Sequence, residues 1–152
     1  EPGSAAAWAQ LSLTLAQLGK QAEAIEAGLK AVELRPEDAN VRSNLGLFLI
    51  NAGRVDEAVE QLKEATRAEP ENATAQYNLG VSLIRLGKRQ EAVACFSEAV
   101  RVKPDYAKAH QNLAIAYVEM GDYQKAITHC DRAVALGAKV QPRLLELLEP
   151  YR

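Results

Sequence analysis

Few side chains in this sequence are suited to catalysis or metal binding, because its 152 residues include only two cysteines and two histidines. Cys95 and Cys130 form no Cys-x-x-Cys motif, so their spacing suggests neither a zinc site nor a redox pair. His110 and His129 fall on different predicted helices, with no Ser, Cys or carboxylate at a spacing typical of a triad. We therefore expect no catalytic residue, no metal site and no cofactor, and predict that the chain is not an enzyme.

Three regularly spaced asparagines have side chains that can form hydrogen bonds with a ligand. Asn44, Asn78 and Asn112 are each 34 residues apart and fall in the middle of predicted helices. Asn is an indifferent helix former, so its recurrence there suggests a task. Its amide offers a donor and an acceptor, which match the backbone of an extended peptide. The alternative is that these amides only satisfy hydrogen bonds between repeats, since buried amides need partners in either case.

The architecture that positions these side chains is predicted from a sequence repeat of 34 residues. Such a period indicates a solenoid, in which each repeat buries its apolar face against its neighbours. Four series of residues carry the period: Leu at 11, 45, 79 and 113; Gly at 19, 53, 87 and 121; Ala at 24, 58, 92 and 126; and Pro at 36, 70 and 104.

Each repeat is predicted to be a pair of helices. In residues 39–72, apolar side chains recur at helical spacing on both sides of Gly53. Gly53 can end the first helix in the left-handed conformation, Asp56 can cap the second, and Pro70 stops it. Ser4, Asp38 and Asn72 occupy the N-cap positions before the first helix of repeats 1, 2 and 3, whereas Tyr106 replaces the cap in repeat 4 and Asp105 is expected to serve instead.

Small residues at equivalent positions predict close packing within each hairpin. Gly46, Gly80 and Ala114 follow the recurring leucine, and two helices approach closely only where one presents little side chain. The recurring alanines at 24, 58, 92 and 126 are expected to supply the facing surface. Beyond residue 140 the period ends, and a leucine-rich segment after Pro142 predicts a helix over 141–152 that caps repeat 4. The alternative for this segment is an amphipathic helix that binds a partner.

Composition and charge restrict the class of protein. Apolar residues make up 48% and charged residues 25% of the chain, as in globular proteins. The net charge of −2, with both signs interspersed, argues against nucleic-acid binding. No apolar run is long enough to span a bilayer, and no cleavable signal peptide is visible, so we expect a cytoplasmic protein without membrane insertion. The chain begins with Glu1 rather than Met, which suggests that it is a piece of a longer protein.

Residues 5–140 resemble the tetratricopeptide repeat family. The resemblance implies an all-α, right-handed α-solenoid in which residues 1–140 form four hairpins (5–38, 39–72, 73–106 and 107–140) and 141–152 form the C-terminal capping helix. Arg42, Gln76 and His110 depart from the family by replacing its leading aromatic residue, and Ala138 replaces the last proline. The matching residues are Trp8, Leu11, Gly19, Ala24, Ala31 and Pro36 in repeat 1, and Leu79, Gly80, Gly87, Ala92, Phe96, Ala99 and Pro104 in repeat 3.

The same resemblance implies a concave groove, lined by the first helix of each hairpin, that takes a peptide. The asparagine series resembles the ladder in the repeats of O-GlcNAc transferase. A clamp for a C-terminal carboxylate fits poorly, because Ser43 and Leu47 stand where the family has Lys and Asn. Arg85 and Lys108 are expected to favour an acidic residue in the partner. The candidate peptide-binding residues are Asn40, Asn44, Leu47, Asn51, Tyr77, Asn78, Val81, Arg85, Lys108, Gln111, Asn112 and Ile115.

We therefore predict a protein–protein interaction module that holds an extended or short helical segment of a partner in this groove. Two alternatives remain open. The chain can be a self-assembling scaffold whose repeat ends or convex faces stack, or the substrate-recruiting arm of a larger enzyme such as a glycosyltransferase. A monomer is favoured, because the segment 141–152 has to be displaced before repeats can stack head to tail.

Overall fold

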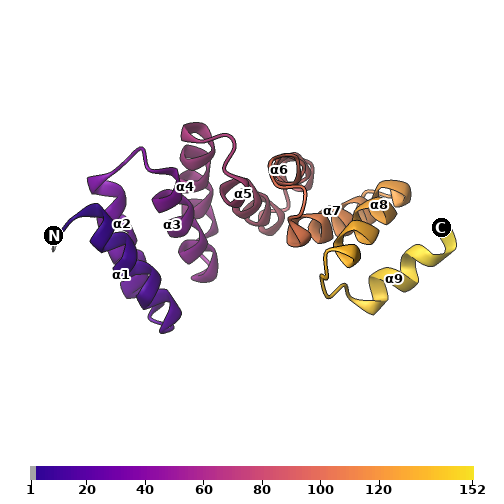
Figure 1. Cartoon of the computed structure of the whole chain (residues 1–152), viewed down its shortest axis with the longest axis horizontal. Helices are drawn as coiled ribbons and strands as arrows, with labels where there is room; N and C mark the ends of the chain where they lie inside the picture. The colour runs from indigo at the N-terminus through magenta and orange to yellow at the C-terminus, as the bar shows by residue number, and fades with distance from the viewer. Residues whose placement is uncertain (1–2) are drawn as a thin grey trace.

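The computed structural model describes residues 3–152, and within that range it contains only helices and the turns between them. Four antiparallel pairs follow one another and a shorter ninth helix ends the chain (Figure 1). The helices are α1 (Ala5–Gln17), α2 (Gln21–Leu34), α3 (Ala39–Asn51), α4 (Val55–Ala68), α5 (Ala73–Arg85), α6 (Arg89–Val102), α7 (Ala107–Glu119), α8 (Tyr123–Ala135) and α9 (Pro142–Leu148), with a 3₁₀ turn, η1, over Glu149–Tyr151.

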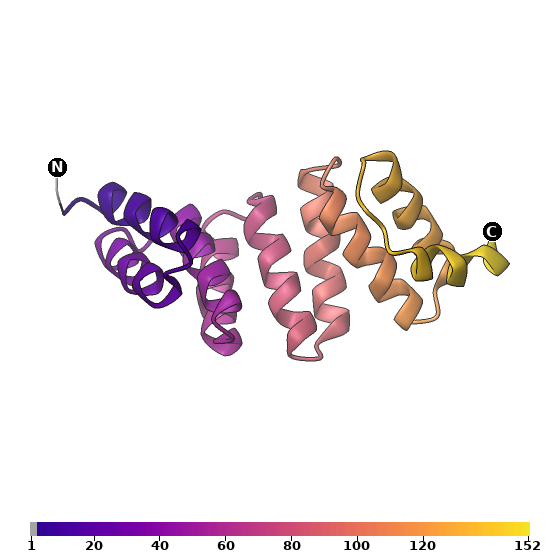
Figure 2. The same cartoon turned by 90° about the horizontal axis from the view of Figure 1, so that it is seen from below.

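The hairpins stack side by side along one axis, so the described chain is elongated and its two ends lie far apart (Figures 1 and 2). Each helix packs mainly against its hairpin partner, and the second helix of each pair packs against the first helix of the next. A continuous core runs through the first three pairs and reaches Leu113 in α7. The predicted all-α solenoid of helical hairpins is confirmed. None of the helices in residues 3–152 is long and apolar enough to cross a membrane.

The turn inside each hairpin is made by glycine, as the sequence predicts. Gly19, Gly53, Gly87 and Gly121 have φ values of 76°, 76°, 74° and 78°. This left-handed region is strained for residues that carry a Cβ, so glycine ends the first helix of every pair.

The predicted N-caps of the first helices are confirmed in repeats 1, 2 and 3. Ser4 accepts a hydrogen bond from the Ala7 amide, Asp38 from the Asn40 and Val41 amides, and Asn72 from the Ala75 amide. These bonds satisfy backbone donors that a helix start otherwise leaves free.

Two other capping predictions are wrong. Asp56 lies inside α4, which begins one residue earlier at Val55 and has no side-chain cap. Tyr106 occupies the N-cap position of α7 and neither it nor Asp105 supplies a side-chain cap. Only α8 among the second helices of the pairs has a side-chain cap, from Asp122 to the Lys125 amide.

The small residues in the first helices do allow close packing, although their partners differ from the prediction. A Cβ added to Gly80 would lie 2.6 Å from Cε1 of Phe96, and one added to Gly46 would lie 2.6 Å from Cγ of Leu62. The atoms nearest to these glycines therefore belong to a large residue four positions after the recurring alanine, not to the alanine itself. In repeat 4 the equivalent pair is Ala114 and Cys130, both fully buried in one cluster.

Helix α9 covers the outer side of the fourth hairpin. Leu148 is fully buried in the cluster formed with Ala126 and Cys130. The chain after α9 is also attached to α8, because the Arg152 guanidinium contacts the Asp131 carboxylate at 2.7 and 3.2 Å. The ring of Tyr151 stacks on Tyr123 with the centroids 3.8 Å apart.

Candidate peptide-binding groove

An apolar pocket of about 210 Å³ lies where α5 faces α7. Its apolar lining comes from Val81 and Ile84 on α5, Ile115 and Ala116 on α7, and Phe96 on α6. Phe96 is fully buried, whereas 39% of Ile84 and 36% of Ile115 are exposed. The position of these side chains follows from the helical repeat, because residues three or four apart share one face of a helix. The pocket can accept one apolar side chain of a ligand.

Apolar surface continues from this pocket toward the end of the chain. A second pocket of about 200 Å³ shares Ile115 and Glu119 with the first and is completed by Val118 on α7 and by Leu144 and Leu147 on α9. On α3, Leu47 is 38% exposed at the position equivalent to Val81 and Ile115. We name the surface formed by these two pockets the α5–α7–α9 groove.

Three charged side chains line the groove, and two of them, Arg85 and Glu119, have partners within the protein; the third is Arg143 on α9. Arg85 Nη1 donates to the backbone oxygen of Ile50 at 2.6 Å, which ties α5 to the preceding repeat. The Glu119 carboxylate accepts from Arg89 Nε at 2.6 Å. Lys108 lies in the first turn of α7, eleven residues before Glu119, so about 16 Å of helix rise separates it from the end of the groove that Arg85 lines. The main pocket includes Arg85 but not Lys108.

The structure places the predicted asparagine ladder in unequal environments. Asn78 is 5% exposed, and its Nδ2 lies 3.5 Å from the Ser43 hydroxyl. Asn112 is half-buried, and its Nδ2 donates to the Tyr77 hydroxyl at 3.4 Å. Both bonds join an asparagine to the residue 35 positions earlier. For Asn44, the residue at that distance is Ala9, which has no polar side-chain atom.

Tyr77 is held by packing as well as by this hydrogen bond. Its ring centroid lies 5.7 Å from that of Phe96 and 4.9 Å from that of Tyr106. Burial raises the pKa of the Tyr77 hydroxyl above its ordinary value, and the bond from Asn112 opposes this shift. The hydroxyl therefore stays protonated at neutral pH.

The remaining predicted residues lie on the first helices but outside the α5–α7–α9 groove. Asn40 Oδ1 accepts from Asn72 Nδ2 at 3.1 Å, again between repeats, and Asn51 is exposed at the end of α3. Gln111 Nε2 lies 3.5 Å from the Lys139 carbonyl. Of the twelve predicted residues, the main pocket brings together Val81, Arg85, Asn112 and Ile115.

Phe96 and the α9 leucines are groove residues absent from the prediction. Phe96 belongs to a second helix, whereas the prediction considered only first helices. Its signal in the sequence is the glycine opposite, because Gly80 leaves room for the ring to reach the groove. The leucines of α9 carried a visible apolar pattern, but their approach to Ile115 depends on how α9 folds back.

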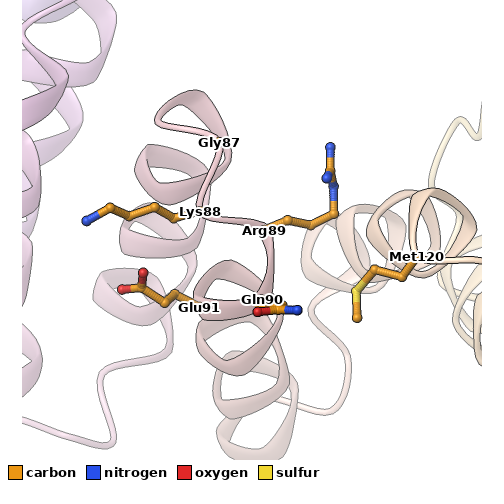
Figure 3. Close-up of a pocket in the computed structure, with 6 residues that line it drawn as sticks. All are labelled: Gly87, Lys88, Arg89, Gln90, Glu91 and Met120. Atoms are coloured by element: carbon orange, nitrogen blue, oxygen red, sulfur yellow. The ribbon is translucent and has the colours of Figure 1, made fainter.

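A separate, more polar pocket of about 310 Å³ lies at the turn between α5 and α6. It is lined by residues 87–91 and by Met120 at the end of α7, and Gln90 and Met120 approach it from opposite sides (Figure 3). Arg89, on the same turn, is the residue that pairs with Glu119 at the groove edge. The lining of this pocket includes the charged side chains of Lys88, Arg89 and Glu91 but no Ser, Cys or His.

Side chains with reactive groups lie elsewhere. Burial raises the pKa of the Cys95 thiol to about 11, with the Glu91 carboxylate adding to the shift, so little thiolate forms at neutral pH. His110 and His129, whose spacing in the sequence does not predict a contact, lie with their Nδ1 atoms 2.9 Å apart. In residues 3–152 no group of three or more His, Cys, Asp or Glu side chains is placed to hold a metal.

Solved structures show how widely this architecture is shared. PilF of Pseudomonas aeruginosa superposes with a TM-score of 0.88 at 26% identity, over 97% of this chain and 67% of that one. MamA of MSR-1 gives 0.74 at 27% identity, over 88% and 77% of the two chains. MamA from Desulfovibrio magneticus RS-1 gives 0.79 at 24%, over 90% and 77%, which shows the fold alone. No curated protein sequence matches the chain.

Family models match most of the sequence. A tetratricopeptide repeat model matches residues 5–38, a TPR repeat model matches residues 49–87, and another tetratricopeptide repeat model matches residues 71–139. Stacked hairpins of this kind are the architecture of protein–protein interaction scaffolds, which offer extended surfaces and few enclosed sites. Since these models span both halves of a chain that folds as four such hairpins, the protein belongs to the tetratricopeptide repeat family.

Proposed function

We propose that the protein binds a peptide segment of a protein partner in the α5–α7–α9 groove. The observation that carries the proposal is the apolar pocket between Val81, Ile84 and Ile115, which remains partly exposed although neighbouring apolar side chains are buried. Exposed apolar surface in a concave position is typical of a site that another molecule covers. The ligand's own apolar side chain enters this pocket, and its backbone runs along the first helices.

The composition of the free groove surface favours a ligand that is anchored by apolar contacts. Arg85 donates from Nη1 to Ile50, and Glu119 pairs with Arg89, so bonds within the protein hold both side chains in place. Free groove surface is mostly aliphatic. We therefore expect the ligand to carry Leu, Ile, Met or Phe at its anchor position.

Selection from a random peptide library displayed on phage tests the proposal. Enriched peptides should share an aliphatic or aromatic anchor, and their affinity should fall at least about tenfold for Ile115→Lys, because a buried apolar contact is lost. Leu18→Lys is the matched control, since Leu18 is 68% exposed in the α1–α2 turn and lies outside the groove. Peptides that bind both variants as well as the original chain would contradict the proposal.

Self-association is a second candidate, favoured by the outer face of α1. Leu11 is 43% exposed, whereas its equivalents Leu45, Leu79 and Leu113 are 0%, 6% and 0% exposed beneath the preceding repeat. A second copy that covered this face would bury Leu11 in the same way. Light scattering over a range of concentrations tests this candidate. A monomer throughout would reject it, and an oligomer that Leu11→Glu dissociates would support it.

Other expectations from the sequence keep the status of predictions. They are the absence of enzymatic activity and of nucleic-acid binding, the cytoplasmic location, and the alternative in which the chain is the recruiting arm of a larger enzyme. A cap role for the segment 141–152 is part of the present proposal, because α9 buries Leu148 against repeat 4 and also lines the groove.

A further inference from the structure

Repeats 2, 3 and 4 share a polar contact that ties each first helix to the end of the preceding repeat. Arg42 Nε donates to the Pro36 carbonyl at 2.5 Å, and Gln76 Nε2 donates to the Pro70 carbonyl at 3.2 Å. In repeat 4 the equivalent residue is His110, whose Nε2 lies 3.2 Å from the Pro104 carbonyl. Because a carbonyl oxygen only accepts, His110 must carry a proton on Nε2.

This bond sets the tautomer of His110, so that its Nδ1 is an acceptor. This Nδ1 lies 2.9 Å from Nδ1 of His129 on α8. The corresponding contact in repeat 2 joins Arg42 to Gln61 at 2.6 Å, so the same place in the hairpin holds two imidazoles in repeat 4. The His129 ring is itself supported by Tyr117, which stacks on it with an interplanar angle of 9°.

Without a metal this contact is a hydrogen bond in which Nδ1–H of His129 donates to Nδ1 of His110, and an ion that replaces this proton would have both nitrogens as ligands. Imidazole nitrogens bind Zn²⁺ and similar ions at about 2.0–2.1 Å, so two nitrogens 2.9 Å apart match adjacent ligands at an angle of about 90°. Such an angle belongs to octahedral and square-planar coordination, the geometries of Ni²⁺ and Cu²⁺. The rings must turn so that both lone pairs converge on the ion, and the χ2 torsion of histidine is broad enough to permit this.

The surroundings support the same assignment. Histidines that bind metals usually donate their other ring N–H to a carbonyl or a carboxylate, as His110 does to Pro104. Both imidazoles border a cavity of about 520 Å³, which has room for water molecules to complete the coordination. Burial lowers the pKa of both rings, so each is neutral at neutral pH, and His129 has to move its proton from Nδ1 to Nε2 to present a lone pair to the ion. This cavity shares no residue with the main pocket between α5 and α7.

We propose that His110 and His129 together bind one divalent transition-metal ion, with affinity in the order Cu²⁺ > Ni²⁺ > Zn²⁺. One feature of the cavity opposes the ion. The Arg132 guanidinium borders it and lies 3.5 Å from the Pro104 carbonyl, while the nearby Asp131 carboxylate is paired with Arg152. The site therefore consists of two imidazoles and water, and it has a positive neighbour that weakens it.

Isothermal titration of the untagged chain with CuCl₂, NiCl₂ and ZnCl₂ tests this proposal. His110 and His129 are the only histidines in the sequence, so imidazole-dependent binding is attributable to this pair. We expect one ion per chain, and at least about tenfold weaker binding for His110→Gln and for His129→Gln. Gln is chosen because it already occurs at the equivalent positions of other repeats. Gln76 makes the proline contact in repeat 3, and Gln61 occupies the place of His129 in repeat 2. Arg132→Gln should tighten binding.

Proton NMR with substoichiometric Ni²⁺ provides an independent readout. If one ion bridges the pair, the imidazole resonances of both histidines should broaden together, before signals elsewhere in the chain. No measurable binding up to about 1 mM metal, the affinity at which binding free energy is only about 4 kcal/mol, would overturn the proposal. Binding that survives both Gln replacements, or broadening of one imidazole alone, would overturn it equally.

Discussion

The amide of Asn78 lies 3.5 Å from the hydroxyl of Ser43, and both side chains are buried at the junction of the second and third repeats. Asn112 makes the equivalent contact with Tyr77 one repeat later. The ladder that the sequence suggests for peptide binding is therefore engaged, at two of its three positions, in joining one repeat to the next. The amides of Asn78 and Asn112 therefore have a structural role that is distinct from any contact with a ligand.

Replacing single asparagines should have unequal effects on stability. Asn78→Ala leaves the buried Ser43 hydroxyl without this partner, and should lower the free energy of unfolding by about 1–3 kcal/mol. Asn44→Ala should change it by less than about 0.5 kcal/mol, because Ala9 offers no partner and alanine is the better helix former. Urea unfolding of the two variants measures the difference. Equal losses would show that Asn44 has a structural role that its surroundings do not reveal.

The same variants separate stability from binding once a groove peptide is in hand. If the Asn112 amide contacts the ligand backbone, we expect Asn112→Ala to weaken peptide binding by about 1 kcal/mol. We expect Asn78→Ala to leave the peptide affinity of the folded fraction unchanged. Fluorescence anisotropy at a temperature where every variant is folded provides the measurement. A ladder that reads the backbone throughout would instead lose affinity at both positions.

A larger residue at position 80 should destabilise the fold, because Phe96 lies directly against Gly80. Gly80→Ala places a methyl group 2.6 Å from the Phe96 ring, and should destabilise the fold by about 1–3 kcal/mol through overpacking. Repeat 4 avoids this clash at the equivalent positions, where Ala114 is buried in one cluster with Cys130, whose side chain is smaller than that of Phe96.

The control is therefore a double-mutant cycle with Phe96→Cys. If the two residues pack against each other, Gly80→Ala should cost less beside Cys than beside Phe, with a favourable coupling of about 0.5–3 kcal/mol. Additive losses would mean that the added methyl group is accommodated in some other way.

Leu148 should anchor α9 to the fourth hairpin. This side chain is fully buried, so Leu148→Ala should lower the free energy needed to detach α9 by about 2–5 kcal/mol and raise amide exchange in residues 142–151. Leu147→Ala is the matched control, because Leu147 is 41% exposed on the same helix. Hydrogen exchange followed by mass spectrometry resolves the segment. Equal exchange in the two variants would argue against a cap that is held by burial.

The metal-free protein should lose stability in mild acid because of its histidine pair. Burial lowers the pKa of His129, and the neighbouring His110 adds to the shift. Burial likewise lowers the pKa of His110, against the bond to Pro104 and together with the Arg132 charge. The unfolded chain then takes up protons first, so the contribution to stability is complete above the unfolded pKa of about 6.5 and is lost as pH falls through the lower folded values.

Urea titrations at pH 7.5 and pH 5 in EDTA measure this loss. The other charges around the cavity are Arg132 and the Asp131–Arg152 pair, and they are retained in a variant that carries both His110→Gln and His129→Gln. We expect this double variant to lose less stability between the two pH values than the original chain does. An equal loss would assign the acid sensitivity to the carboxylates instead.

The repeat sequence by itself determined the fold, because period, turn glycines, N-caps and small packing residues all depend on local backbone geometry. Gly53 has the required left-handed conformation and Asp38 caps α3, since each needs only its immediate chain neighbours. The prediction for Asp56 was wrong by two residues, because the N-cap of α4 is Arg54, and an error of this size is within the usual variation of helix boundaries.

Only the tertiary structure decided how the candidate sites are built, because their contacts join residues that a helix or a whole repeat separates. Asn78 meets a side chain 35 residues earlier, and whether that position holds Ser43, Tyr77 or Ala9 sets the role of each amide. His110 and His129 are 19 residues apart and looked unrelated in the sequence, yet the antiparallel packing of α7 and α8 brings their Nδ1 atoms within 2.9 Å. Distances of this kind depend on helix crossing and side-chain direction, which a one-dimensional pattern does not specify.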